Sequence, residues 1–173
     1  LKVDQLSWQG STSVTLSDVR ARYAFDGQAH QLDVDSLALA QGRYSLQARL
    51  QGAAPMALHV TAQGQVQTPP NGRTPTLQLQ VKSMVQGQLS GPQAQLSLQA
   101  ELAPSPGQGV LGRAHDKVHL SLQAQIQPWQ EQALVQAKGQ WQALDLAPLW
   151  PGAPQTRLQG QAQLQPNGAA RQL

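Results

Sequence analysis

Long stretches of this chain alternate an aliphatic residue with glutamine or another polar residue. Segments 77–81, 94–100 and 118–126 carry Leu, Val, Ile or Ala at every second position. Successive side chains of a β-strand point to opposite faces of the sheet, so each segment would present one aliphatic and one polar face. No window of useful length has the apolar period of an amphipathic helix. The sequence therefore predicts an all-β chain.

Turn and loop signals divide the chain into roughly nine to eleven strands. Asp26 and Gly27 both tolerate positive φ and predict a hairpin turn. Prolines cannot donate to a β-ladder, so the Pro-rich stretches 67–75 and 104–117 are expected to be loops. Residues 144–151 do not alternate, and one helical turn fits them. Residues 1–173 are expected to form a single all-β segment, a fragment of a longer protein whose first residues read as mid-strand.

The composition argues against several classes of function. Charged residues make up 12% of the chain, about half the usual share, because Gln fills most polar positions. The 12 Lys and Arg residues are scattered and the net charge is only +3. Nucleic-acid binding needs a clustered basic face with stacking aromatic side chains, so no nucleic-acid partner is expected. The absence of cysteine excludes disulfides and thiolate metal sites.

Few residues suggest chemistry. His115 and His119 would share a face on a helix, but loop and strand are expected there, which favours a surface position. Asp33 and Asp35 would share a strand face, where a solvated position is favoured over a calcium site. The chain has no Gly-x-Ser-x-Gly elbow and no phosphate-binding loop running from a strand into a helix. We therefore expect a protein that is not an enzyme, with no catalytic residue, metal or cofactor.

The combined aliphatic face is the main functional feature. Roughly ten strands with about three apolar residues each would exceed the few hundred Å² that a soluble monomer exposes. Two arrangements would cover this surface: a closed β-sandwich, or an elongated, curled, antiparallel or mixed sheet whose concave face holds acyl chains or an apolar peptide. The many small residues on this face favour the trough. The groove residues predicted from alternation are Leu77, Leu79, Val81, Val85, Leu89, Leu96, Leu98, Leu120, Leu122 and Ile126.

Two segments resemble a known family. Residues 141–151 contain Leu-Asp-Leu-x-x-Leu with adjacent prolines, and residues 158–160, Leu-Gln-Gly, open the next strand. This phrase, and the pattern of residues 32–42, is similar to TamB and related AsmA-like proteins. The resemblance implies a periplasmic protein anchored in the inner membrane of a Gram-negative bacterium, with an elongated β-sheet curled around a hydrophobic interior. Such proteins are implicated in moving phospholipids toward the outer membrane, and they have no catalytic motif.

The resemblance also implies partners. Phospholipid acyl chains would lie in the groove, shielded between the inner and outer membranes. TamB in addition partners an Omp85-type outer-membrane barrel protein and is linked to the assembly of autotransporters and other barrels. Two alternatives therefore remain open. The groove could act as a chaperone for nascent barrel strands, or the chain could be a closed β-sandwich with a structural or adhesion role.

Overall fold

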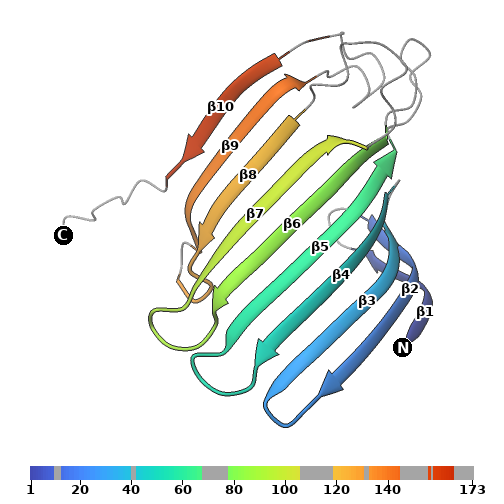
Figure 1. Ribbon diagram of the computed structural model, residues 1–173, viewed down its shortest axis with the longest axis vertical. Coiled ribbons are helices and arrows are strands. Elements are labelled where there is room, and N and C mark those ends of the chain that lie inside the picture. Colours follow the sequence, from blue (N-terminus) through green and yellow to red (C-terminus); the bar gives the residue numbers. More distant parts are fainter. Residues whose placement is uncertain are drawn as a thin grey trace.

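The computed structural model describes residues 1–9, 13–39, 42–67, 78–105, 119–130, 133–144, 156 and 158–165. Within them the chain forms ten β-strands, each antiparallel to the next, in one sheet of order β1 to β10 (Figure 1). The strands are β1 (Lys2–Gln9), β2 (Ser13–Phe25), β3 (Ala29–Leu39), β4 (Gly42–Gln51), β5 (Ala57–Gln67), β6 (Gln78–Gln88), β7 (Gln95–Pro104), β8 (His119–Ile126), β9 (Leu134–Leu144) and β10 (Leu158–Leu164). The predicted all-β fold is confirmed.

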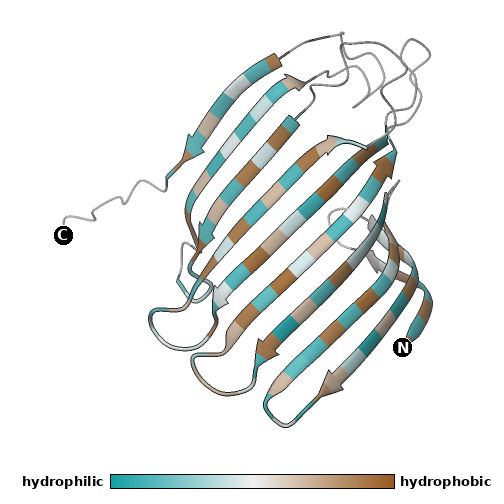
Figure 2. Ribbon diagram, viewed as in Figure 1, coloured by the Kyte–Doolittle hydropathy of each residue, from teal (hydrophilic) through white to brown (hydrophobic). Residues whose placement is uncertain are grey.

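The register keeps like side chains on like faces. Directly paired residues project to the same side of an antiparallel sheet, and the apolar residue Val85 pairs with Val60 on one side and Leu98 on the other. The polar residue Gln99 pairs with Gln123. Figure 2 shows the resulting alternation along the strands. A slip of one residue would exchange the two faces, so the aliphatic pattern itself specifies the pairing.

The first strands switch the parity of their apolar positions midway. In β2 the apolar series passes from Leu16 to Val19, and in β3 it passes from Val34 to Leu37, where the pairing register shifts. Asp18 adopts a φ of 53° at the β2 irregularity. An extra residue of this kind is a β-bulge. Because the bulges of β2 and β3 lie beside each other, both halves of each strand keep their aliphatic side chains on the same face.

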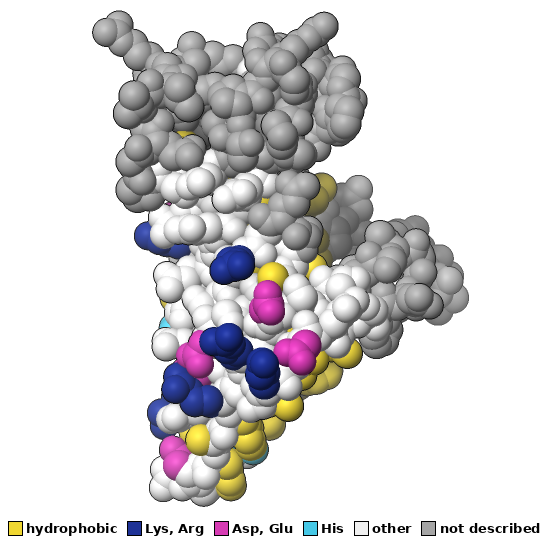
Figure 3. Space-filling model, turned by 90° about the vertical axis from the view of Figure 1, so that its right-hand side faces the viewer, with side chains coloured by type: hydrophobic (Ala, Val, Ile, Leu, Met, Phe, Trp, Pro, Cys, Tyr) yellow, Lys and Arg dark blue, Asp and Glu magenta, His cyan; other side chains and the backbone are white. Residues whose placement is uncertain are grey.

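The sheet curls and stays open. In Figure 1, β1 and β2 lie behind β3 and β4. Figure 3 looks at the molecule from the right-hand side of Figure 1: charged side chains are grouped on the surface facing the viewer, and hydrophobic side chains gather toward the rear of Figure 1. The aliphatic face therefore lies on the inside of the curl. Among the described residues the strands form one open sheet, so the trough-like prediction holds and the two packed sheets of a closed β-sandwich are not found.

Four hairpin turns form a connected edge, which we call the turn rim: residues 26–28, 52–56, 89–94 and 127–130. Backbone hydrogen bonds join the first turn to the second, from Gly52 N to Gln28 O at 2.7 Å. The second joins the third from Leu89 N to Met56 O at 3.1 Å. The third accepts a bond from the Trp129 indole Nε1 to Leu89 O at 2.5 Å. These bonds tie one long side of the trough together along the direction of the curl.

The first turn depends on an ionised aspartate. Asp26 Oδ1 accepts the backbone N–H groups of Gln28 at 2.9 Å and Ala29 at 2.6 Å. These two hydrogen bonds lower the pKa of Asp26 below its usual value of 3.8, and the bond from Ala29 has the larger effect. A carboxylate whose pKa is lower in the folded state than in the unfolded state contributes its full stabilisation at pH values above the unfolded pKa. This stabilisation is lost as pH falls through the folded value.

Asp26→Asn removes the negative charge and keeps the turn's hydrogen bonds, because the amide oxygen can still accept the two backbone N–H groups. We expect the unmodified chain to lose stability as pH falls through and below about 4, and the variant to lose less over the same interval. Urea unfolding at a series of pH values measures this difference. Parallel pH profiles for the two chains would contradict the role of the charge.

Two glycines provide a test of the sheet geometry. Gly87 has a φ of +151°, and a Cβ added there would collide with the backbone oxygen of Gln95. A Cβ at Gly139 would have no heavy atom within 4 Å. We expect Gly87→Ala to lower the free energy of unfolding by more than about 1 kcal/mol. Gly139→Ala should leave it unchanged or raise it by about 0.5 kcal/mol. Equal effects in urea denaturation would contradict the described backbone.

Candidate functional site

The aliphatic face has no second layer among the described residues. Only seven apolar residues of the described part of the chain are buried, and no large side chain among them is fully enclosed. Five of the seven are alanines, and the buried set is Ala21, Ala29, Val34, Leu79, Ala94, Ala124 and Ala143. An ordinary domain of this length encloses its larger aliphatic side chains between layers. Here they are half-buried beside one another, and no described residue forms a layer over them.

Small residues form a lane across the middle of this face. The lane follows directly paired residues from β2 to β10, perpendicular to the strands and along the direction of the curl. Its members, the central lane, are Ala21, Val34, Leu46, Ala62, Ser83, Ala100, Leu122, Gly139 and Ala162. Six of these nine are Ala, Ser or Gly, so the lane has less side-chain volume than the rows beside it.

Bulkier rows border the central lane on both sides. On the side of the turn rim the paired residues are Tyr23, Leu32, Ala48, Val60, Val85, Leu98, Ala124, Ala137 and Leu164. On the other side they are Leu37, Tyr44, Gly64, Val81, Leu102, Leu120, Trp141 and Gly160. Because Leu, Val and aromatic side chains are larger than Ala and Gly, these rows carry more side-chain volume than the central lane between them.

Most of the predicted groove residues lie together on this face. Direct pairing places there Leu79, Val81, Val85, Leu96, Leu98, Leu120, Leu122 and Ile126. Leu79 is buried and the other seven are half-buried. Leu89 lies one residue beyond β6, in the turn rim, where its backbone bonds to Met56 and Trp129. Leu77 lies outside the described residues.

Two aromatic side chains on the face escaped the sequence analysis. The Tyr44 ring lies over its directly paired neighbour Gly64 and over Gly42, because a Cβ at either glycine would overlap the ring. Trp141 covers Gly160 in the same way, with Cζ2 2.9 Å from where a Cβ would lie. Aromatic rings laid on cross-strand glycines keep the face apolar where a side chain is missing. Only the register shows which glycine lies opposite which ring.

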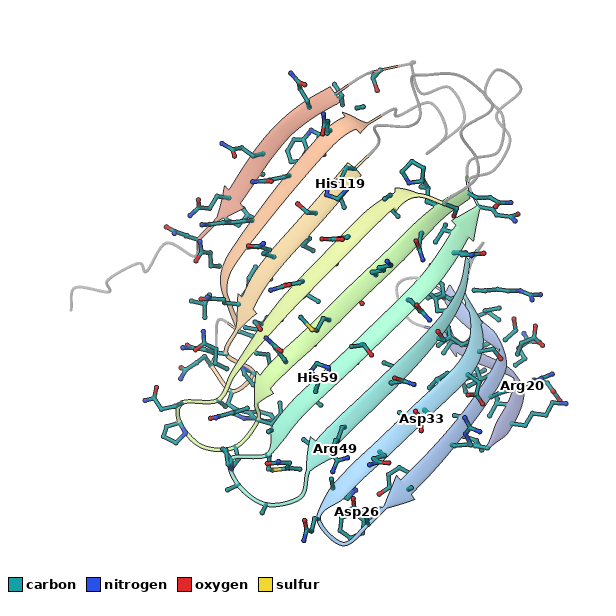
Figure 4. The ribbon with its side chains drawn as sticks, viewed as in Figure 1. Arg20, Asp26, Asp33, Arg49, His59 and His119 are labelled. Carbon is teal, nitrogen blue, oxygen red and sulfur yellow. The ribbon has the colours of Figure 1, made fainter. Side chains whose placement is uncertain are left out.

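The outward face is polar, and its charges are few and exposed. A hollow of about 510 Å³ is lined by the charged residues Arg22, Asp33, Asp35 and Lys82, by polar residues of β4 and β5, and by four residues of the central lane, Val34, Leu46, Ala62 and Ser83. Arg22 Nη2 and Asp35 Oδ1 lie 2.9 Å apart with both side chains at least half exposed, and such pairs contribute little to stability. Figure 4 shows Asp33 on this face of the sheet.

The residues considered for metal binding do not converge in the described part of the chain. No three His, Cys, Asp or Glu side chains gather there as a metal site would require. His119 begins β8 on the outward face, and His115 lies outside the described residues. A search for helices able to cross a membrane, made over the described residues, finds none.

Comparison of the chain with protein-family models, with curated proteins and with solved structures finds no match in any of the three.

A pair of neighbouring residues tests whether the aliphatic face is accessible. Leu98 is half-buried on that face, and Gln99 is exposed on the other. We expect Leu98→Ser to reduce the fluorescence of a bound apolar dye such as anilinonaphthalene sulfonate, at a stability cost of about 1 kcal/mol. Gln99→Ser should leave dye fluorescence unchanged. Both are measured without denaturant, where the chains are folded. An equal response to the two changes would contradict an accessible aliphatic face.

Proposed function

We propose that this chain is a segment of a periplasmic TamB/AsmA-like protein and that its aliphatic face shields phospholipid acyl chains passing between the inner and outer membranes of a Gram-negative bacterium. The observation that carries the proposal is the aliphatic face on the inside of a curled, single-layered sheet. A continuous apolar surface of this kind on a protein marks a binding surface or an aggregation hazard. An acyl chain would cover it.

The central lane gives the acyl chain a path. Each methylene group removed from water contributes about 0.8 kcal/mol, so a chain laid on this face is held without any directional bond. Because the lane runs across the strands, a chain can shift from one strand to the next against similar apolar side chains. This binding is non-specific and passive, and it needs neither a catalytic residue nor a cofactor.

A second candidate is a chaperone for outer-membrane barrel strands or a contact with an Omp85-type barrel protein. The observation that favours it is the outer edge of β10, which pairs with no further strand among the described residues; its seven residues, Leu-Gln-Gly-Gln-Ala-Gln-Leu, are uncharged and all exposed. At the opposite edge, Lys2 and Asp4 pair at 3.4 Å, and edge charges discourage further pairing. An incoming strand that alternates apolar and polar residues would extend both faces of the sheet.

Ala100→Trp tests the lipid proposal at the middle of the central lane. Native mass spectrometry with lipid extraction, on chain purified from bacterial lysate, should find phospholipid bound to the unmodified protein. Ala100→Trp should bind less, because the indole would occupy a small-residue position of the central lane between two bulkier rows. The matched control is Gln99→Trp, which adds the same ring to the outward face of the same strand and should retain lipid.

The alternatives give different results in the same experiment. Unmodified protein that carries no lipid and takes up no fluorescent acyl chain would overturn the proposal. If that protein instead binds a peptide with barrel-strand alternation, and loses it on Gln161→Pro in β10, the chaperone role gains support. Equal lipid loss in both tryptophan variants would show that the central lane is not the binding surface.

A further inference from the structure

We propose that the hollow at the β2–β3 end of the turn rim binds a zwitterionic phospholipid headgroup, one that carries a phosphate and an ammonium group. The inference rests on the proposed function, because the acyl chains of the same lipid would lie on the aliphatic face. It adds to that function a fixed polar site at one position along the trough.

Residues of both faces of the sheet line the hollow, where the strands end at the turn rim. It measures about 600 Å³ and is lined by Phe25, His30, Arg49, Gln51 and the two adjoining turns. Phe25 and His30 are a directly paired couple on the aliphatic face, next to Leu50 of β4. Arg49 and Gln51 belong to the outward face. A ligand in the hollow would therefore meet apolar rings on one side and polar groups on the other, as the head–tail junction of a phospholipid requires.

Aromatic side chains form the apolar wall. The rings of Phe25 and His30 stack with centroids 4.5 Å apart, and Tyr23 OH lies 2.6 Å from His30 Nδ1. Phe25 is 54% exposed and Tyr23 is 64% exposed. Aromatic rings with a polar tip favour the boundary between an apolar and a wet environment. No second group of stacked aromatic rings occurs in the described part of the chain.

Arg49 lines the polar side of the hollow, and the Asp26 carboxylate lies next to it. Arg49 Nη2 lies 3.8 Å from Asp26 Oδ2, with both side chains about half exposed. This distance is too long for a direct hydrogen bond, so the guanidinium keeps its donors for another acceptor. The backbone N–H groups of the turn bond to Oδ1 of Asp26, and Oδ2 is the oxygen that lies beside Arg49 at the margin of the hollow. The two charges complement a phosphate and an ammonium group, respectively.

The rest of the turn rim offers no comparable site. Its described residues outside the first turn are Gly, Ala, Pro, Met, Leu, Ser, Gln and Trp, with no charged side chain among 52–56, 89–94 and 127–130. Figure 4 shows Asp26 and Arg49 at the same end of the sheet, at the β2–β3 turn and near the end of β4. A charged headgroup meeting this rim would therefore find its partners at the first turn.

Two lipids with the same acyl chain test the site. Lysophosphatidylethanolamine carries the zwitterionic headgroup, and the matching monoacylglycerol lacks it. Arg49→Gln should weaken binding of the first by about five- to tenfold, as expected for loss of a charge-assisted hydrogen bond at a partly exposed site. Binding of the monoacylglycerol should not change. The matched control is Arg43→Gln, on the same strand and face but at the far end of β4, which should affect neither lipid.

The outcomes separate this site from the proposed function. If Arg49→Gln weakens both lipids equally, or neither, the headgroup site is wrong while the acyl groove stands. If the unmodified chain binds neither lipid, the proposed function itself is overturned and the headgroup site with it. A preference for the zwitterionic lipid that disappears in Arg49→Gln, persists in Arg43→Gln and weakens with added salt supports the site.

Discussion

The antiparallel register is the constraint on which the rest of this structure depends. Each strand alternates aliphatic and polar residues, but alternation alone gives ten separate two-faced ribbons. Direct pairing, as between Val85 and Leu98, merges them into one aliphatic and one polar surface. The bulges of β2 and β3 also keep the aliphatic surface continuous. Without the extra residue at Asp18, half of β2 would turn its apolar side chains outward. The central lane and both bordering rows follow from this register.

An open aliphatic face and a neutral polar face each carry a risk of association with other chains. The first invites association through its side chains, and the second lacks the charge that normally keeps β-sheets apart. The curl places the aliphatic surface on the inside, which reduces its contact with other proteins. Seven of the twelve charged residues in the ten strands lie in β1 to β3, and they include the ion pairs of Lys2 with Asp4 and of Arg22 with Asp35. The β1 edge of the sheet therefore carries charges that discourage further strand pairing, whereas the β10 edge carries none.

The sequence was most informative where alternation ran longest. It predicted the strands and faces of β6 to β8, the hairpin at Asp26–Gly27 and a curled sheet with small residues on its inner face. It could not place the bulge at Asp18, because a residue with positive φ inside a strand has no periodic signature. The stacking of Tyr44 on Gly64 and the meeting of Arg49 with Asp26 also escaped it. These contacts depend on which residues come to lie beside each other across strands and turns.

The central claim is that acyl chains lie along the central lane. Photo-crosslinking with a fatty acid that carries a diazirine in its chain, followed by peptide mass spectrometry, tests it most directly. The account predicts labels on inner-face residues of several successive strands, such as Leu46, Ala62, Ala100 and Leu122, and none on the intervening glutamines. Labels confined to the outward face, or no labelling above that of a denatured control, would contradict it.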